Sequence, residues 1–356
     1  MSTSSLSLLL TGILPLGFFT PSLALDSSST FNCQDQLDRP MYSSYVAAKT
    51  NAAPILIAAR SRSKGKKKAK PVAAVKTSTN VPHWSKGIKI PFRNWIPKEK
   101  PTHVVVCVHG LGFSSQSYEQ FGRQMAGNRI AVYALDVRGF GEWRKNRGNA
   151  EVDFDAAVFD IEAALKAVRA AYPSTPIILV GESMGGGLVL AAASRFPGIA
   201  DGVISSAPSA DRYAELTSDL YVGTHFVEDK DKAIDITPIV VDRMTSDEAL
   251  QDQFKANPLN KMKLTPEELK QFEEFMKEND DRVALIERTP VLMLAGFKDR
   301  LVKPAGTTDL FDETSCPEKI LLVVGDGEHF LLEENQLTPQ LKWLLLSWIR
   351  NPRSGR

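Results

Sequence analysis

Residues 177–194 read IILVGESMGGGLVLAAAS, and they carry more structural information than any other part of this 356-residue chain. Ile177 to Val180 is a short apolar run that indicates a buried strand, and the run from Gly186 to Ser194 favours a helix. A serine on the sharp turn between a strand and a helix projects its hydroxyl above the sheet, and bulky side chains two residues away on either side would clash. Gly181 and Gly185 occupy those two positions around Ser183. We therefore predict that Ser183 is a nucleophile, and the alternative is a purely structural glycine turn.

Similar apolar runs recur along the chain and predict the fold class. They are Val104 to Val108, Ile130 to Leu135, Val203 to Ser206, Val291 to Ala295 and Ile320 to Val324. These runs do not alternate with polar residues, as expected of strands that are covered on both faces. Helical patterns lie between them, most clearly from Asp155 to Ala171. Strands that alternate with helices predict an α/β fold with a mainly parallel sheet.

One interval, residues 209–288, breaks this alternation. It is rich in charged residues and helix formers, and Thr265-Pro266-Glu267-Glu268 is a typical helix start. We predict a helical cap inserted between two strands. Its apolar side chains would line an acyl pocket or form the core of the cap, and the sequence does not separate these two interpretations. These side chains are Leu216, Leu220, Tyr221, Phe226, Ile236 and Ile239.

A serine nucleophile needs a base, an acid and donors for the oxyanion. Of the five histidines, His329 lies just beyond the last predicted strand, where this class of fold places its sites, so we predict it as the base. Asp299 directly follows the Val291 strand, and we predict that it orients His329. The backbone N–H groups of Met184 and Leu111 are the predicted oxyanion donors. His109, which ends the Val104 strand, is predicted to hold the loop around Leu111.

A glycine turn at residues 136–142, DVRGFGE, follows the Ile130 strand. It lacks the Lys-Ser/Thr pair of a phosphate-binding loop and the spacing of a dinucleotide motif. We interpret it as structural, and the sequence predicts neither a cofactor nor a metal ion. The three cysteines are Cys33, Cys107 and Cys316, whose wide spacing indicates no zinc or redox motif, although one disulfide stays possible.

The N-terminal 82 residues differ from the rest of the chain. Leu6 to Phe19 is largely apolar and is followed by small residues, which predicts a signal peptide over 1–24 and export to the cell envelope or the medium. The alternatives are an uncleaved membrane anchor, or an apolar start without a targeting role on a cytoplasmic protein. Residues 25–82 are predicted to be a disordered basic linker, with seven positive charges in RSRSKGKKKAK at 60–70. The linker could hold the protein to an anionic membrane or envelope surface, or it is only a solvated spacer. Nucleic acid is not expected as a partner, because no aromatic residues are interleaved. The folded domain is predicted over 83–356.

Several motifs together resemble the α/β-hydrolase superfamily, within it the monoacylglycerol lipase and lysophospholipase-like group of the serine aminopeptidase S33 type. They are HGLG at 109–112, DVRGFGE at 136–142, GESMGG at 181–186, SAP at 206–208, the segment Ser246-Asp247 through Asn257-Pro258-Leu259, GFKDRLV at 296–302 and GEHFLLEE at 327–334. The resemblance runs from about Ile88 to Ile349. It implies a central sheet of about eight strands under a helical cap, the triad Ser183, Asp299 and His329, and an oxyanion hole at Leu111 and Met184. Glu182 and Glu142 depart from the residues that many members carry, which are His and Ser.

The expected reaction is therefore hydrolysis of a monoacylglycerol or lysophospholipid-type ester through an acyl-enzyme on Ser183. A short-chain carboxylesterase and a peptidase acting on small substrates would use the same triad. From another class, the chain could be a catalytically inactive binding protein on a hydrolase scaffold, or a surface-attached adaptor that uses its basic linker. All three triad residue types are present, which favours an enzyme.

Overall fold

A computed structural model describes residues 44–48, 55–59, 89–145, 151–213, 232–332 and 336–353. For residues 44–48 and 55–59 it describes the backbone alone. The predicted signal peptide over 1–24 lies outside the described residues, as does most of the predicted basic linker, including 60–70.

A nine-stranded sheet forms the centre of the described chain, with the order β2-β1-β11-β10-β7-β6-β4-β5-β3. The strands are β1 (Ser44–Ala48), β2 (Ile55–Ala59), β3 (Phe92–Trp95), β4 (His103–Val108), β5 (Ile130–Leu135), β6 (Ile177–Glu182), β7 (Gly202–Ser206), β10 (Val291–Gly296) and β11 (Lys319–Val324). The six neighbours from β5 to β11 pair in parallel, and β3 and β1 add antiparallel at the two sides of this block. Parallel pairing brings the carboxyl ends of these six strands to one edge of the sheet.

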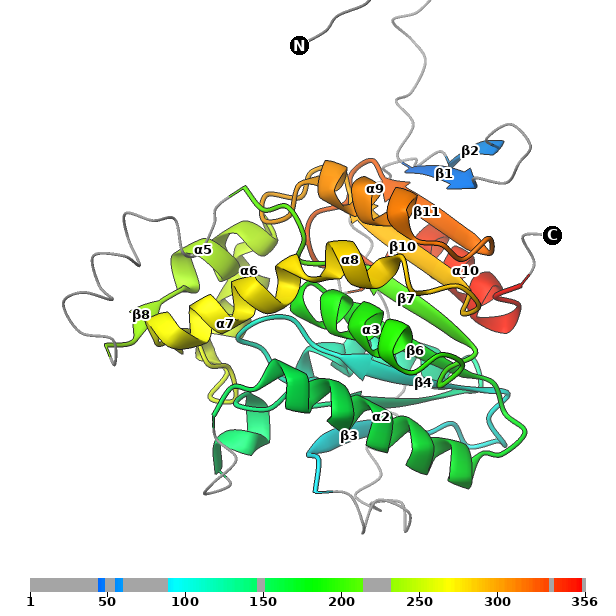
Figure 1. The fold of residues 1–356 in the computed structure, drawn as a ribbon, viewed down its shortest axis with the longest axis horizontal. Coiled ribbons are helices and arrows are strands. Elements are labelled where there is room, and N and C mark those ends of the chain that lie inside the picture. The colour runs from blue at the N-terminus through cyan, green and yellow to red at the C-terminus, as the bar shows by residue number, and fades with distance from the viewer. Residues whose placement is uncertain are drawn as a thin grey trace, which may run out of the picture. The chain divides into compact units, whose positions relative to one another are not determined.

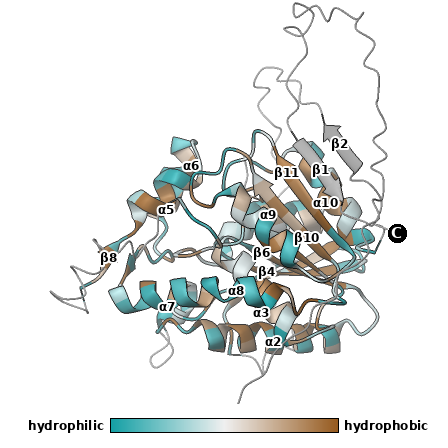
Figure 2. Cartoon of the chain, turned by 45° about the horizontal axis from the view of Figure 1, so that its top comes forward, coloured by the Kyte–Doolittle hydropathy of each residue, from teal (hydrophilic) through white to brown (hydrophobic). Residues whose placement is uncertain are grey.

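All six strands expected from apolar runs are confirmed, and the parallel α/β class with them. They form because Val, Ile and Leu side chains cover both faces: Val104, Val106 and Val108 enter one apolar cluster, and Val105 and Cys107 enter the other. Strand β3, with the sequence FRNW, was missed, because four residues with two polar side chains carry no continuous apolar run. Figure 2 shows the apolar colour concentrated in the central strands.

Helices cover both faces of the sheet, as Figure 1 shows. On one face lie α2 (Phe154–Ala171), α3 (Met184–Arg195), α8 (Asn279–Val283) and α9 (Pro304–Glu313), and on the other lie α1 (Glu119–Ala126) and α10 (Pro339–Arg350). The predicted helices at 155–171 and 186–194 are α2 and α3. Asp153 caps α2 by accepting a hydrogen bond from Ala156 N–H, which explains why the helix begins there.

The predicted cap lies between β7 and β10, at one end of the sheet (Figure 1). It contains α5 (Thr237–Met244), α6 (Glu248–Ala256) and α7 (Pro266–Lys277), after which α8 follows. It also contains two paired strands of two residues each, β8 (Ile234–Asp235) and β9 (Lys263–Leu264). Thr265 begins α7 as expected: its hydroxyl accepts from Glu268 N–H, and the Glu268 side chain accepts from Thr265 N–H. Residues 214–231 of the cap, with Leu216, Leu220, Tyr221 and Phe226, lie outside the described part of the chain.

Two short strands lie within residues 25–82, the range that the sequence analysis assigns to a disordered basic linker. The structure forms strands β1 and β2 there, with β1 antiparallel to β11 and β2 antiparallel to β1. The segments SYVAA and ILIAA contain no charge and hold β-branched or aromatic residues, unlike the lysine-rich stretch that follows. Strand β11 would otherwise present a row of unpaired backbone groups at the sheet edge, so pairing satisfies them.

No helix among the residues that the structure describes is long and apolar enough to cross a membrane.

Candidate active site

Ser183 occupies a strained turn between β6 and α3. Its φ angle is 58°, in the left-handed region that residues with a Cβ seldom adopt. A Cβ on Gly181 would overlap the Gly185 carbonyl, and one on Gly185 would overlap the Val108 carbonyl. The backbone closes this turn by bonds from Ser183 N–H to Ser206 O and from Gly187 N–H to Ser183 O. The two glycines are therefore required where the sequence analysis placed them, and the chain tilts Ser183 out of the sheet.

The loop after β4 lies against Ser183. A Cβ built on Gly110 would stand 3.4 Å from Ser183 Cβ and 3.3 Å from the Phe330 ring. The buried His109 holds this loop, because its Nδ1 bonds Gly110 O at 2.8 Å and its Nε2 accepts from Val137 N–H at 3.0 Å. These partners assign the neutral tautomer, and burial lowers the pKa of His109 and favours that neutral form. The structural role expected of His109 is confirmed, and Leu111 follows directly in the same loop.

Met184 is the first residue of α3, so its N–H is one of those that a helix leaves without an intrahelical acceptor. Its amide stands at the positive end of the helix dipole. Leu111 and Met184 are both buried, with 4% and 0% of their surface exposed. The loop around Gly110 and the start of α3 thus flank the Ser183 side chain, as an oxyanion hole requires.

Asp299 and His329 meet as a buried pair. Asp299 Oδ2 lies 2.8 Å from His329 Nδ1, and both side chains are at most 2% exposed. The other oxygen of Asp299 accepts from Leu301 N–H at 2.7 Å and from Val302 N–H at 3.0 Å. Three hydrogen bonds therefore lock the carboxylate, and the carboxylate in turn fixes the imidazole with Nε2 directed away from it.

Ser183 Oγ is hydrogen-bonded to Ser209 Oγ at 3.2 Å. His329 Nε2 is buried and has no hydrogen-bond partner in the described part of the chain. The structure therefore brings Asp299 and His329 into contact and places Ser183 beside a second hydroxyl. Resting enzymes often show such a loosened arrangement, in which the hydroxyl turns toward the base when substrate binds. The sequence analysis missed Ser209, since a serine three residues beyond a strand carries no distinctive pattern.

Glu182 lies directly behind the elbow and is buried. Its Oε1 accepts from Leu332 N–H at 3.0 Å and from Ser206 Oγ–H at 3.2 Å. Burial raises the pKa of Glu182 to about 7, and the hydrogen bonds and the nearby His329 oppose that rise. The sequence marked this position as a departure from the family pattern without indicating what the carboxyl contacts.

The cap is tied to the His329 loop through Glu328. Glu328 Oε2 accepts from Thr245 Oγ1–H at 2.7 Å and from Ser246 N–H at 2.9 Å. Burial acts to raise the pKa of Glu328, yet the hydrogen bonds from Ser246 and Thr245 outweigh it and hold the pKa below its ordinary value. His329 N–H also donates to Met244 O at 3.2 Å. The junction between α5 and α6 therefore contacts both Glu328 and His329, the predicted base.

The DVRGFGE turn is structural, as interpreted. The buried Asp136 accepts from Ser115 N–H at 2.7 Å and from Glu142 N–H at 2.9 Å, and no phosphate cradle is needed to explain its glycines. Gly141, at φ 55°, leaves no room for a Cβ against the Asp136 carboxylate.

Cys107 is a buried free thiol, as expected, and Cys316 is a second one. Burial, aided by the Glu182 charge, raises the pKa of Cys107, so this thiol stays neutral. Cys33 lies outside the described residues. Within the described ranges no group of three or more His, Cys, Asp or Glu side chains could hold a metal ion.

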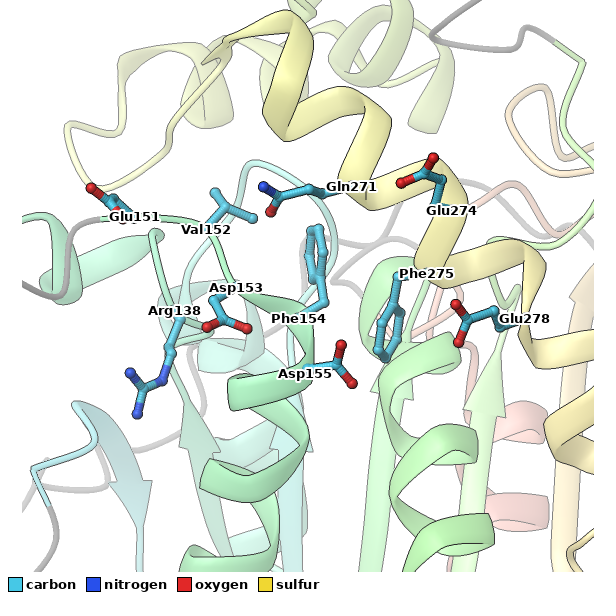
Figure 3. Close-up of a pocket in the computed structure, with 10 residues that line it drawn as sticks. All are labelled: Arg138, Glu151, Val152, Asp153, Phe154, Asp155, Gln271, Glu274, Phe275 and Glu278. Carbon is cyan, nitrogen blue, oxygen red and sulfur yellow. The ribbon is translucent and has the colours of Figure 1, made fainter.

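A polar cavity of about 520 Å³ lies away from these residues, between the start of α2 and helix α7 (Figure 3). Five carboxylates and one guanidinium dominate its lining: Glu151, Asp153, Asp155, Glu274, Glu278 and Arg138. Figure 3 shows Phe154 and Phe275 between them. Arg138 forms an ion pair with Asp160 at 2.6 Å, and Asp160 does not line the cavity, so the lining is acidic. None of the three predicted triad residues lines this cavity.

Comparison with known families gives a match to the serine aminopeptidase S33 hydrolases over residues 99–336, about two thirds of the chain. The chain belongs to this family. It is thereby a serine hydrolase with the α/β-hydrolase fold, and the matched region includes all three predicted triad positions.

Individual relatives agree with the family match. The chain is 26% identical to the monoacylglycerol lipase of Mycolicibacterium smegmatis over 74% of its own length and 93% of that protein. It is 26% identical to the mouse monoglyceride lipase over 72% of its own length and 85% of that protein. Among solved structures, a soluble variant of the Saccharomyces cerevisiae monoglyceride lipase in complex with a substrate analogue superposes with a TM-score of 0.64 at 18% identity, covering 78% of this chain and 97% of that one. The Paleococcus ferrophilus monoacylglycerol lipase superposes with a TM-score of 0.63 at 20% identity, covering 74% of this chain and 100% of that one. At these identities the solved structures establish the fold alone.

Proposed function

We propose that the protein hydrolyses monoacylglycerol-type lipid esters through an acyl-enzyme on Ser183. The proposal rests on the strained turn at Ser183, which the Gly110 loop flanks and the start of α3 follows. The same chain also forms the buried Asp299–His329 pair. The names of the curated relatives support the substrate class. Lysophospholipids differ from monoacylglycerols in the head group, and we include them in the proposed range.

The residues take the following roles. His329 Nε2 accepts the proton of Ser183 Oγ as the hydroxyl attacks the ester carbonyl, and Asp299 keeps Nδ1 protonated and stabilises the imidazolium. The backbone N–H groups of Leu111 and Met184 stabilise the oxyanion, each by roughly 3 kcal/mol. His329 then gives its proton to the leaving glycerol oxygen. Water, deprotonated by His329, attacks the acyl-enzyme and releases the fatty acid, which restores Ser183.

The acyl pocket is proposed under the cap. Ile236 is buried and Ile239 is partly buried, and both pack in the same apolar cluster as cap residues such as Val240 and Met244. These contacts favour the cap-core interpretation for these two residues. We assign the acyl-contacting role to the cap as a whole, whose α5–α6 junction reaches the His329 loop.

The test compares the full wild-type chain with Ser183→Ala on monoacylglycerols, lysophospholipids, p-nitrophenyl esters of graded chain length and aminoacyl p-nitroanilides. Loss of monoacylglycerol hydrolysis in Ser183→Ala, with the fold retained, is expected. The best substrate separates the lipase from a short-chain esterase, and turnover of the anilides alone would replace the proposal with a peptidase. Absence of all turnover and of labelling of Ser183 by a fluorophosphonate would mean an inactive binding protein.

We further propose that residues 60–70 bind anionic lipid surfaces and that the chain is exported after cleavage behind Ala24. Seven positive charges in eleven residues support the first, and the apolar run from Leu6 to Phe19 supports the second. Replacing the seven Lys and Arg by Gln should abolish co-sedimentation with phosphatidylserine vesicles and leave ester hydrolysis unchanged. N-terminal sequencing of the mature chain should begin at Leu25.

A further inference from the structure

Glu182 is a buried carboxyl group that the proposed reaction does not use. It is 3% exposed and comes from the last position of β6, next to the nucleophile. Its hydrogen-bond donors come from two other elements: Leu332 N–H, three residues after His329, and Ser206 Oγ–H, at the end of β7. The backbone carbonyl oxygen of Ser206 accepts from Ser183 N–H. The Glu182 side chain therefore joins the elbow, β7 and the His329 loop.

The contacts themselves do not require a charge. Both partners donate, and an uncharged glutamine oxygen would accept from both without the cost of burying a carboxylate. No Lys or Arg side chain pairs with Glu182 in the part of the chain that the structure describes. Burying a carboxylate without a cation beside it costs desolvation free energy. A neighbouring group that gains positive charge during the reaction would offset this cost.

His329 is that group. Leu332, whose N–H donates to Glu182 at 3.0 Å, lies three residues after His329 in the same loop, and a positive charge on His329 acts to lower the pKa of Glu182. The interaction is mutual, so an ionised Glu182 favours the imidazolium form of His329. Among the described residues, the titratable groups that interact electrostatically with Glu182 are His329, from the loop after β11, and Cys107, from β4. The Cys107 thiol is neutral, because burial raises its pKa, and contributes no charge. Asp299 is the carboxylate that contacts His329 directly, at Nδ1.

We infer that Glu182 is a second carboxylate serving His329: it positions the base through Leu332 and stabilises the imidazolium that forms when Ser183 is deprotonated. It acts through His329 without touching the substrate and is a positioning residue. This inference rests on the proposed function of Ser183 and His329. It assigns two separable effects to one side chain, a tether that needs only an acceptor oxygen and a charge that needs the ionised carboxyl.

The test uses the full chain and three variants. Glu182→Gln keeps an acceptor oxygen at the same reach and removes the charge, Glu182→Asp keeps a charge and withdraws it from Leu332, and Glu182→Met removes both. The rate of Ser183 phosphonylation by a fluorophosphonate and kcat/KM for the best ester are measured from pH 5.5 to 9. The ratio of wild type to Glu182→Gln should be about tenfold at pH 8.5, equivalent to about 1.4 kcal/mol of transition-state stabilisation. It should fall toward one below pH 6, where the wild-type carboxyl is itself protonated.

A structural role alone would produce a ratio that is the same at every pH, and that result, or equal rates at pH 8.5, would overturn the inference. Glu182→Asp should be slower than wild type across the range and keep the pH-dependent advantage over Glu182→Met. Failure of the proposed function is distinct from failure of this inference, since it would abolish labelling of Ser183 in the wild type. Thermal unfolding confirms that each variant is folded.

Discussion

Ser183 combines an unfavourable backbone conformation with a confined setting. A non-glycine residue at φ 58° costs of order 1–3 kcal/mol, which the packing around the turn must offset. The elbow can be this sharp because Gly185 lets α3 approach the carbonyl of Val108, and Gly181 lets the turn approach Gly185. The proposed reactivity of the Ser183 hydroxyl thus depends on the absence of side chains at two neighbouring positions.

Gly185→Ala should unfold or strongly destabilise the protein, by more than about 3 kcal/mol, because its Cβ would overlap the Val108 carbonyl. Gly127→Ala is the matched control: a Cβ there meets nothing closer than 3.5 Å and the backbone is helical, so stability should hold or rise slightly. Urea unfolding of both variants measures the difference. A soluble Gly185→Ala with wild-type stability would contradict the tight elbow.

Asp299→Asn should reduce kcat by about 10⁴-fold, because an amide at this position no longer holds Nδ1 of His329 in its protonated form. The control is Asp326→Asn in the same region, whose exposed ion pair with Lys298 contributes little. Steady-state ester hydrolysis with both variants checks the assignment. A small change in Asp299→Asn would place the acid of the triad elsewhere.

At the scale of elements, the cap is joined to the catalytic loops at few points. Thr245 and Ser246, between α5 and α6, bond to Glu328, and Lys261 N–H in the β8–β9 region donates to Gly112 O at 2.7 Å. Two of these bonds reach the His329 loop, and the third reaches the Gly110 loop. The position of the cap therefore depends on the two loops that build the site.

Glu328→Ala should raise KM severalfold with a smaller effect on kcat, because it removes two acceptor bonds that hold the α5–α6 junction while leaving the Asp299–His329 pair in place. The exposed Glu287→Ala should change neither constant. Initial rates over a range of substrate concentration separate the two parameters. Should kcat fall alone, Glu328 would act on the base and have no role in placing the cap.

Thr265→Ala should destabilise the protein by about 1 kcal/mol, because it removes the hydroxyl that caps α7. Thr308→Ala, inside α9, should be nearly neutral, since its hydroxyl only returns a bond to Pro304 O within the helix. Thermal unfolding monitored by circular dichroism compares the two. Equal losses would mean that the capping box contributes nothing to α7.

At the scale of the whole molecule, burying Glu182 makes stability depend on pH. Its pKa is raised from an ordinary 4.5 to about 7, so between these values the folded state holds a proton that the unfolded state has lost. The free energy of unfolding should therefore fall as pH rises through this window, by about 1.4 kcal/mol per pH unit at most. Glu182→Gln should lack this component. Urea unfolding of both proteins from pH 5 to 8 isolates it, and parallel curves would show that the carboxyl ionises normally.

How much of the structure could be predicted from the sequence differed between strands, loops and side-chain contacts. Six buried strands were predictable because each is a continuous apolar run, and β3 was not, because FRNW contains two polar residues. Strands β1 and β2 were missed because they lie inside a segment that is poor in large apolar residues and dominated by Ser, Thr, Ala, Lys and Arg. The elbow, His329 and Asp299 were predictable from their places after strands, since parallel strands bring their carboxyl ends together. The contacts of Ser209, Glu328 and Glu182 were not, because each joins residues far apart in the chain.

The amino-acid sequence alone determined the class of fold, the serine at the turn and the order of the three proposed catalytic residues. Local rules suffice for these, since apolar periodicity and glycine placement depend only on near neighbours. The tertiary structure decided which oxygen of Asp299 meets His329, that Ser183 rests against Ser209, and that the Glu182 carboxyl is buried behind the base. These depend on burial and on distances across the fold, and packing sets both only when the sheet, the cap and the loops have come together.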